Sequence, residues 1–252
     1  MGIMNESGLS IWVGNQRKYT EGDLDGKWIR LPKKSEDLET ILNQISNHGQ
    51  DELAIMDIDL GDNCSWLSDY IDEYDDIREL NVLAKLIGEN DHPAVDTYLI
   101  NGGNLTISEL ANLLIQEEEI PFFPYEFEGS DNPEVMRNLT SEEKMGYTVI
   151  EQDKNLKGFL DTYEVGGMTN IGQYINVGNI GRDLSFSDYV DLSENGYLDK
   201  RMEFPDLNAY TIEEIEMELD EQELKLQKLE PQKVEQKEQI KQKEKTPTGP
   251  KL

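Results

Sequence analysis

The chain has 252 residues and carries 53 Asp and Glu against 23 Lys and Arg, which gives a formal net charge of −30 at neutral pH. Nucleic acid and anionic lipid repel a protein of this charge, so we expect no direct binding to DNA, RNA or a membrane surface. This surplus of negative charge destabilises a compact fold through self-repulsion, and solubility alone needs far less negative charge. The composition therefore indicates a partner with a basic surface.

This charge belongs to the part of the sequence that is expected to fold. Residues 1–203 hold 41 acids and 15 bases, so acidic tails do not explain the imbalance. Hydrophobic residues make up 37% of the chain, which is enough for small cores. The single cysteine, Cys64, excludes an internal disulfide and fits a reducing compartment, and the sequence shows no secretory signal or membrane span. We therefore expect a cytoplasmic protein.

Residues 11–60 are predicted to form an N-terminal α+β domain. Short strands are expected at 11–14, 27–31 and 53–59, where β-branched and aromatic residues are bounded by turn residues. Between the second and third strands, Ser35 is predicted to be the N-cap of a helix with apolar residues at helical spacing. The pattern favours a helix packed on a three-stranded antiparallel sheet.

Residues 61–120 are predicted to form a mainly helical middle domain. One amphipathic helix is expected over 77–87, because its apolar residues recur on one face. Thr106 and Glu109 have the three-residue spacing of a capping box and mark the start of another helix.

Residues 121–203 are predicted to form a C-terminal α+β domain. Thr140 and Glu143 form a second capping pair, and a closing hairpin is expected around Asn195 and Gly196.

The last part of the sequence, 204–252, is predicted to be a charged tail. Residues 206–223 carry eight acids and no base, whereas 224–252 carry eight Lys and four Glu. Thr211 and Glu214 have capping-box spacing, so a short helix is expected, followed by disorder.

The sequence offers no convincing catalytic or metal site. His48 and His92 are both interpreted as surface residues in polar turns, and Cys64 has neither a neighbouring histidine nor a CxxC partner. A partial EF-hand pattern begins at Asp191, but Met202 stands where a bidentate Glu is required, so a hairpin is preferred over a calcium loop. We expect no enzyme activity, no cofactor and no metal.

Between Asp51 and Asp91, thirteen acids accompany two bases. Four of them fall at helical spacing from Asp69 to Asp76, and like charges there destabilise a helix by about 0.2–0.5 kcal/mol per pair, so local stability does not explain them. A solvated face is the ordinary interpretation of one charge run, but repeated runs favour a functional role. The candidate phosphate surrogates are Asp57, Asp59, Asp62, Asp69, Asp72, Glu73, Asp76 and Glu79, with Glu117, Glu118 and Glu119 as an extension.

A row of carboxylates has the spacing needed to imitate DNA. B-DNA presents one negative charge per about 1.7 Å of axis. A helix rises about 1.5 Å per residue, so one helix face can supply a carboxylate about every 5 Å. A DNA-binding enzyme would then accept the protein in its Lys/Arg groove in place of its substrate. The hypothesis requires a continuous anionic ridge.

A set of short segments in the sequence matches one known family, in the order that the family has them. The matching segments are 11–15, 18–22, 24–28, 52–59, 77–81, 173–176 and 181–184. They resemble ArdA-type antirestriction proteins. The resemblance implies an elongated chain of about three small α+β domains that forms a homodimer mimicking bent B-form DNA. It also implies inhibition of type I restriction–modification enzymes, through the DNA channel of their specificity and methyltransferase subunits, in defence of incoming mobile-element DNA.

Two questions stay open at this point. Leu80 and Leu83 are candidates for the dimer contact that the resemblance suggests, but packing inside the domain is the preferred alternative. The target could also be another DNA-binding machine, such as a CRISPR effector, a recombination nuclease or a nucleoid protein. A different class of function is an acidic scaffold that acts through its tail, and deletion of 204–252 is expected to separate it from mimicry.

Overall fold

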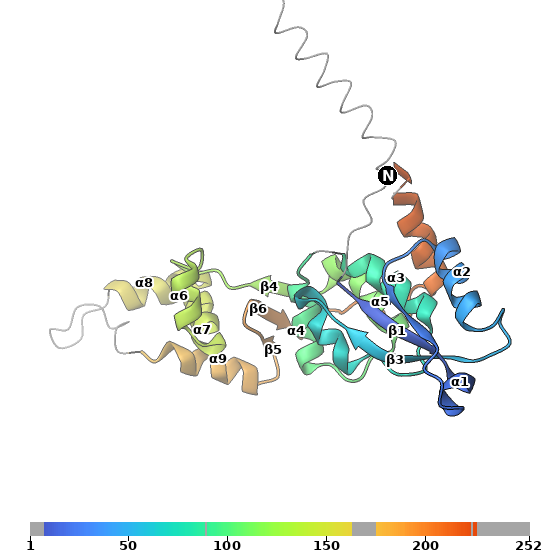
Figure 1. Cartoon of the computed structure of the whole chain (residues 1–252). Helices are drawn as coiled ribbons and strands as arrows, with labels where there is room; N and C mark the ends of the chain where they lie inside the picture. Colours follow the sequence, from blue (N-terminus) through green and yellow to red (C-terminus); the bar gives the residue numbers. More distant parts are fainter. Residues whose placement is uncertain (1–7, 89, 163–174, 223, 226–252) are drawn as a thin grey trace, which may run out of the picture. The chain divides into compact units, whose positions relative to one another are not determined.

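The computed structural model describes residues 8–88, 90–162, 175–222 and 224–225 (Figure 1). The chain is α+β, as predicted, and it divides into two compact units. The first contains Met1–Ser65, Ile71–Glu89 and Asn208–Leu252, and the second contains Trp66–Tyr70 and Asn90–Leu207. The division into three domains and a tail, with bounds at 60, 120 and 203, stays a prediction.

The first unit is built on the predicted three-stranded antiparallel sheet. Its strands are β1 (Ser10–Asn15), β2 (Gly26–Arg30) and β3 (Leu53–Asp59), in the order β2-β1-β3. The pairing of β1 with β3 shifts its register between Trp12 and Val13, which marks a β-bulge. The sequence predicted all three strands because each has β-branched and aromatic residues bounded by turn residues.

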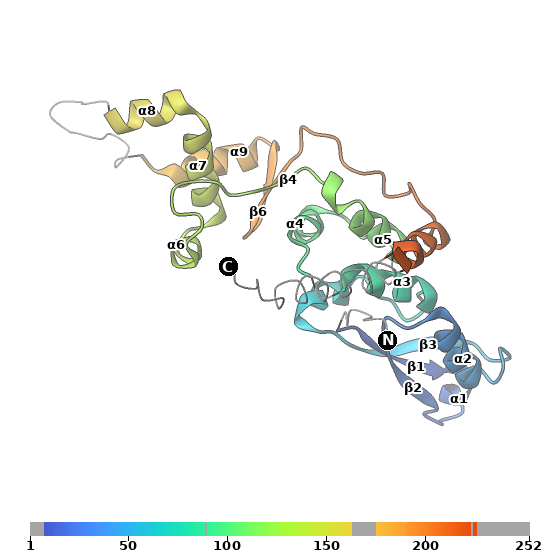
Figure 2. The same cartoon turned by 90° about the horizontal axis from the view of Figure 1, so that it is seen from above.

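Helices cover one face of this sheet. The first unit contains α1 (Gln16–Thr20), α2 (Ser35–Ile45) and α3 (Ile77–Ile87), and Figure 2 shows α3 on one side of the strands. The buried core includes side chains of the strands β1 and β2 and of both longer helices. Its members include Ile11, Val13, Ile29, Leu38, Leu42, Leu80 and Leu83.

The prediction that Ser35 caps α2 is wrong. Lys34 holds the N-cap position and makes no side-chain cap hydrogen bond. The hydroxyl of Ser35 donates instead to Oε1 of Glu216, at 2.6 Å. The tail provides this partner, which local spacing does not reveal.

The predicted tail helix belongs to the first unit. Residues 212–222 are helical, and Thr211 and Glu214 make the reciprocal capping bonds at 2.9 and 3.3 Å. Ile215 has no exposed surface, and the ammonium group of Lys85 contacts Glu216 at 3.1 Å. Disorder was predicted for the tail beyond this helix. Residues 226–252 lie outside the described part of the chain.

The second unit combines helices with a small antiparallel sheet of order β4-β6-β5. The chain enters this unit within the 3₁₀ segment η1 (Asp62–Asp69). Its further elements are α4 (Pro93–Asn101), α5 (Ile107–Ile115), η2 (Glu117–Glu119), β4 (Phe122–Pro124), α6 (Pro133–Asn138), α7 (Ser141–Gln152), α8 (Lys154–Thr162), α9 (Val177–Phe186), β5 (Val190–Leu192) and β6 (Gly196–Asp199).

Both capping boxes predicted for this part of the chain are present. Thr106 accepts a hydrogen bond from the backbone N–H of Glu109 and pairs with it reciprocally at the start of α5, and Thr140 and Glu143 do the same for α7. The hairpin around Gly196 is also confirmed, as the turn between β5 and β6.

The hairpin between β5 and β6 accepts hydrogen bonds from several other segments of the second unit. The carbonyl oxygen of Ser193 accepts hydrogen bonds from the hydroxyls of Tyr125, at 2.9 Å, and Ser141, at 2.7 Å. The buried ammonium group of Lys144 donates to the carbonyl of Glu194 at 2.9 Å. Segments distant in sequence are therefore tied to one turn.

Helices α7 and α9 pack with their backbones in close approach. A Cβ atom on Gly146 would overlap the carbonyl of Val177, and one on Gly181 would overlap the carbonyl of Glu142. Glycine is therefore required at both crossings. Among the described residues, no helix is long and apolar enough to cross a membrane.

Candidate partner-binding surface

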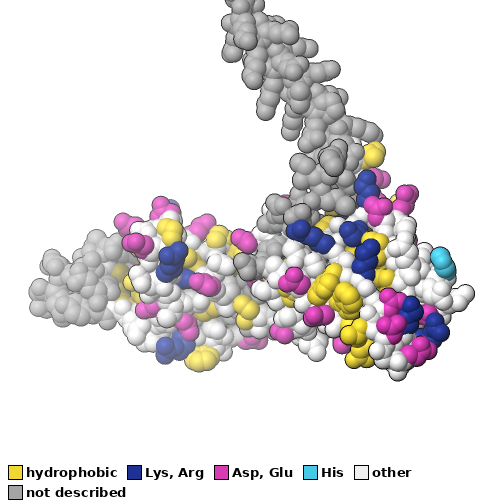
Figure 3. Space-filling model, viewed as in Figure 1, with side chains coloured by type: hydrophobic (Ala, Val, Ile, Leu, Met, Phe, Trp, Pro, Cys, Tyr) yellow, Lys and Arg dark blue, Asp and Glu magenta, His cyan; other side chains and the backbone are white. Residues whose placement is uncertain are grey.

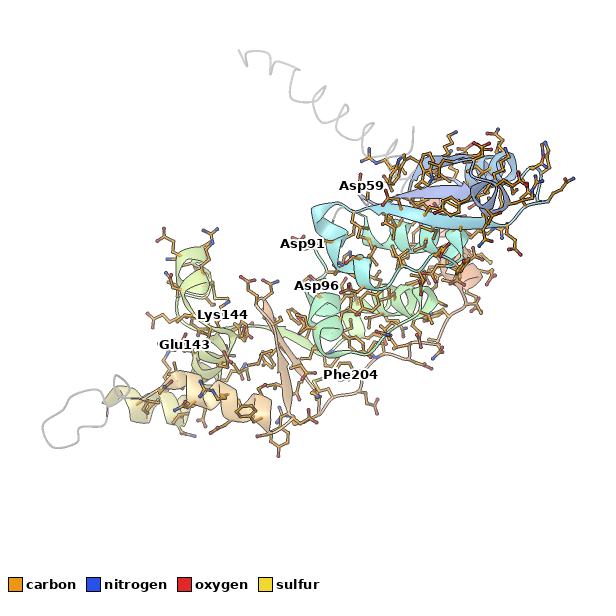
Figure 4. All side chains as sticks on the ribbon, turned by 60° about the horizontal axis from the view of Figure 1, so that its bottom comes forward. Asp59, Asp91, Asp96, Glu143, Lys144 and Phe204 are labelled. Atoms are coloured by element: carbon orange, nitrogen blue, oxygen red, sulfur yellow. The ribbon has the colours of Figure 1, made fainter. Side chains whose placement is uncertain are left out.

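Strand β3 carries two of the predicted phosphate surrogates, Asp57 and Asp59. Both side chains are exposed; because they are two residues apart along a strand, they lie on one face about 7 Å from each other. In the register of the sheet, Asp57 lies opposite Trp12, which in turn lies opposite Trp28. Figure 4 labels Asp59 at the end of the strand. The carboxylate of Asp57 thus lies on the sheet face that carries the tryptophans.

The segment after η1 is not helical, so the four carboxylates at helical spacing do not line one helix face. Residues 70–76 form turns and extended backbone. The backbone N–H of Asp72 donates to Asp75 Oδ2 at 2.6 Å, and Asp76 Oδ1 accepts from the N–H of Arg78 at 2.8 Å. Aspartate competes with helix formation by binding nearby backbone groups, and like charges add repulsion. All four side chains are nevertheless exposed: Asp69, Asp72, Glu73 and Asp76.

This segment runs beside the outer edge of β3. The backbone N–H of Ile55 donates to the carbonyl of Glu73 at 2.9 Å. The contact brings Glu73 close to Asp57, and both side chains line the same hollow of the first unit.

This hollow, which we call the aromatic hollow, has a volume of about 680 Å³. The rings of Trp12 and Trp28 meet edge to face in it, with centroids 5.9 Å apart. From the sequence, the tryptophans were expected only as strand residues. One available signal was that apolar side chains occupy both faces of the strand Ile11–Val13, although only one helical layer was expected. The lining residues are Trp12, Tyr19, Leu24, Trp28, Ile55, Met56, Asp57 and Glu73.

Two of the other proposed surrogates in this region are less suited to that role. Glu79 is half-buried; burial, and then the neighbouring carboxylates of Asp76, Asp75 and Glu213, raise the pKa of its side chain. A raised pKa weakens its ability to imitate a phosphate, which is always charged. The backbone of Asp62 lies in η1, and its side chain lies outside the described part of the structure.

In the second unit, the three glutamates of η2 differ from one another. Glu118 and Glu119 are exposed, whereas Glu117 Oε2 lies 2.7 Å from Nδ1 of His92. His92 is only 8% exposed, so its interpretation as a surface residue is wrong. His48 is exposed, as predicted.

His92 sits among carboxylates at the start of α4. Asp91 directly precedes it and Asp96 follows four residues later; Figure 4 labels both aspartates. Burial raises the pKa of Asp96, His92 lowers it in part, and Asp91 and Glu117 raise it further. Within the described residues, no group of three His, Cys, Asp or Glu is arranged to hold a metal ion.

Leu80 and Leu83, the candidates for a dimer contact, have no exposed surface. They lie in the core of the first unit, which is the alternative that the sequence analysis preferred. A second chain would reach them only if α3 moved.

Many basic side chains are already engaged by carboxylates outside the set of proposed surrogates. Examples from the described residues are Arg17 with Asp51, Lys18 with Asp25, Arg78 with Glu39, Lys85 with Glu216 and Asp220, Lys157 with Glu151, Lys200 with Asp188, and Arg201 with Asp199.

None of the exposed surrogates shares an ion pair with a base within the described part of the chain. These side chains are Asp57, Asp59, Asp69, Asp72, Glu73, Asp76, Glu118 and Glu119. Their charge is therefore left for solvent or for a partner.

The face shown in Figure 3 combines these features. Hydrophobic side chains gather over the sheet of the first unit, and acidic groups are interspersed with Lys and Arg. On this face the carboxylates do not form a continuous ridge in either unit, so the ridge that the hypothesis requires is absent here. Any phosphate mimicry by the first unit must therefore rest on the local group of exposed carboxylates on β3 and the segment beside it.

The sequence matches the model of one known protein family. A family model described as antirestriction protein (ArdA) matches residues 11–199. The match covers three-quarters of the chain, begins within β1 and ends with β6. The helix at 212–222 lies beyond it. No match was found among curated proteins.

Proposed function

Because the chain belongs to the ArdA family of antirestriction proteins, we propose that it inhibits type I restriction–modification enzymes as a DNA mimic. Antirestriction, the inhibition of type I restriction enzymes, is the activity that this family implies. In the proposed mechanism, exposed carboxylates occupy the basic groove of the specificity and methyltransferase subunits, where DNA phosphates would otherwise bind. Incoming mobile-element DNA then escapes cleavage.

The observation that carries this proposal is the set of exposed carboxylates without a basic partner among the described residues. Asp57 and Asp59 are about 7 Å apart, and successive phosphates of one DNA strand are separated by about 3.4 Å of axis. Because phosphates also wind around the axis, their separation in space exceeds this axial rise, so two carboxylates on alternate strand residues have a spacing of the same order as neighbouring phosphates of one strand. The match supports mimicry by β3 and the adjoining segment rather than by a helix.

The proposed inhibition requires no chemical step. Positive groups of the groove exchange their DNA contacts for carboxylate contacts, and opposite potentials steer the two proteins together. We also propose that the inhibitor acts in the cytoplasm as a homodimer, through a contact that does not use the buried Leu80 and Leu83.

A cleavage assay with unmethylated plasmid, a type I enzyme and the full chain tests the proposal. The variant Asp57→Asn/Asp59→Asn/Glu73→Gln removes three exposed charges, and we expect at least about a tenfold rise in the concentration for half-inhibition, which corresponds to about 1.4 kcal/mol.

A matched variant in the second unit removes the same amount of charge from exposed positions outside the surrogate set, through Glu126→Gln, Glu128→Gln and Asp131→Asn. It should inhibit nearly as well as the wild type. Undiminished cleavage at a large excess of wild-type protein would refute the target, and equal losses in the two variants would refute the assigned surface.

A further inference from the structure

The aromatic hollow is an apolar sheet face that the described chain leaves uncovered. Tyr19 is 55% exposed, Leu24 75% and Trp28 45%. Large exposed apolar patches on soluble proteins mark interaction sites. A volume of about 680 Å³ also falls in the range of ligand-binding clefts.

One glycine fixes a wall of this hollow. A Cβ atom on Gly26 would lie 2.6 Å from the carbonyl oxygen of Val13 and 2.9 Å from Nε1 of Trp12, so glycine lets the indole pack against the strands. A Cβ atom on Gly14 would overlap the sulfur of Met56, but that sulfur is near the end of a flexible side chain that can shift. The close approach of Trp12 to the strands therefore depends on Gly26.

The charge of the hollow has one sign. Asp57 lies in register with Trp12, and Glu73 enters from the segment beside β3. The eight described lining residues include these two carboxylates and no base. The bases of the neighbouring α1 are engaged elsewhere: Arg17 pairs with Asp51 and Lys18 with Asp25.

The indole faces and the carboxylates together indicate which kind of chemical group the hollow can bind. A nucleobase could stack on tryptophan, but its phosphate would meet Asp57 and Glu73. A purely apolar segment would leave both carboxylates desolvated without a partner. A cation satisfies both, since tryptophan is the best aromatic partner for a cation and a carboxylate pairs with it directly.

We infer that the aromatic hollow is a binding subsite for arginine side chains presented by the basic surface of a protein partner. Arginine is favoured over lysine because its planar guanidinium stacks on an indole while donating two parallel hydrogen bonds to a carboxylate. The inference rests on the proposed function for the identity of the partner, the restriction enzyme. It adds short-range recognition to a surface otherwise defined by long-range charge.

An NMR titration of the full chain tests the subsite without the enzyme. The probes are N-acetyl-arginine methylamide, its lysine analogue and its citrulline analogue, a neutral isostere, at constant ionic strength. The indole N–H signals of Trp12 and Trp28 should shift saturably with arginine, with affinities falling in the order arginine, lysine, citrulline. The difference from citrulline should be at least about fivefold. Trp66, which lies in the second unit, provides an internal reference.

Variants of the hollow complete the test. Trp28→Ala, followed through Trp12, and Asp57→Asn should each weaken arginine binding about fivefold. Glu52→Gln, an exposed acid of the same unit outside the hollow, should leave it unchanged. The inference is overturned if the two indole signals do not move, if citrulline binds as well as arginine, or if Trp66 shifts equally.

Inhibition assays then separate the subsite from the proposed function. If wild type inhibits and Trp28→Ala raises the concentration for half-inhibition at least about fivefold, the hollow contacts the enzyme. If Trp28→Ala inhibits like wild type, the assignment to that partner is overturned. If wild type does not inhibit, the proposed function fails and the titration alone decides whether the hollow binds arginine. Self-association through the hollow would appear as concentration-dependent indole shifts without probe, and would also overturn the inference.

Discussion

At the scale of single residues, carboxylates that serve the fold differ from those left to solvent in their local contacts. Asp51 is 7% exposed at its side chain and accepts hydrogen bonds from Asn15 at 3.0 Å and from Arg17. Those contacts lower the pKa of Asp51, with the Arg17 bond as the largest cause. Asp57 lacks an ion-pair partner among the described residues and is exposed. A partner's basic groups would therefore meet Asp57 rather than Asp51.

Asp96 gives a prediction about pH. Its Oδ1 is buried without a hydrogen-bond partner in the described structure, and burial raises the pKa of the carboxyl. The cost of ionising it is absent below the ordinary carboxyl pKa, grows as pH rises from that value to the raised pKa, and is constant above it. Asp96→Asn should therefore be more stable than wild type at pH 8, by less than about 1 kcal/mol because the side chain is only half-buried, and the gain should vanish toward pH 3.5.

Urea unfolding at a series of pH values measures this difference. Asp131→Asn, an exposed acid of the same unit, is the control and should show no such pH dependence. A difference for Asp96→Asn that is constant from pH 3.5 to 8 would show that the change acts through packing rather than through the charge.

The distance between partners decided which residue contacts the sequence could predict. The capping pair Thr106–Glu109 was predictable because its members are three residues apart and one spacing defines the motif. Ser35 bonds a residue 181 positions away, and His92 a residue 25 positions away. No local pattern encodes such contacts. Ser35 was therefore predicted to be a helix cap, and His92 was predicted to be a surface histidine.

At the scale of elements, apolar periodicity predicted structure and charge periodicity did not. The strand at 53–59 and the helix at 77–87 were predicted with the bounds that the structure has, because each has side chains that pack on a core. Carboxylates at helical spacing in 69–76 have no face to bury. Tertiary packing stabilises most helices, so the spacing of charges alone did not produce one.

The tail helix at 212–222 gives a second prediction. Ile215 has no exposed surface, whereas Met217 is 66% exposed on the same helix. Ile215→Ala should lower the free energy of unfolding of the first unit by about 2–4 kcal/mol, and Met217→Ala should change it by no more than about 0.5 kcal/mol. Urea unfolding measures both, and equal effects would show that the helix does not stabilise the unit.

The packing of Ile215 also changes how the alternative of a tail-driven scaffold should be tested. Deleting 204–252 would remove Ile215 and the contacts of Glu216 with Ser35 and Lys85. A loss of activity would then report damage to the first unit as readily as loss of a binding element. Removing only 226–252 leaves the helix in place and isolates the basic part of the tail.

At the scale of the whole molecule, negative charge is a property of both compact units. Trp66–Tyr70 and Asn90–Leu207 together hold 24 acids and 7 bases, and the remaining residues before 226 hold 25 acids and 9 bases. The sequence alone established this excess, because it depends only on composition. It could not establish which carboxylates are engaged by bases, since pairs such as Arg17–Asp51 and Lys85–Glu216 join segments that only the fold brings together.

Because both units carry excess negative charge, salt should affect dimer formation and binding to the enzyme in opposite directions. Two copies with a formal charge of −30 each repel one another, and added salt screens that repulsion, with a Debye length of about 10 Å at 0.1 M. The proposed homodimer should therefore form more readily as salt rises. Binding to a basic DNA groove should weaken instead, by at least about tenfold between 50 and 200 mM salt.

Light scattering of the free protein and direct binding to the DNA-free restriction enzyme, over one series of salt concentrations, measure the two equilibria. We expect the mass to rise from 28.9 kDa toward twice that value while affinity for the enzyme falls. The Asp57→Asn/Asp59→Asn/Glu73→Gln variant should show a shallower fall in affinity, because fewer of its charges enter the groove. A dimer that dissociates in salt would mean that ion pairs join the subunits, and enzyme binding that is insensitive to salt would contradict phosphate mimicry as its driving force.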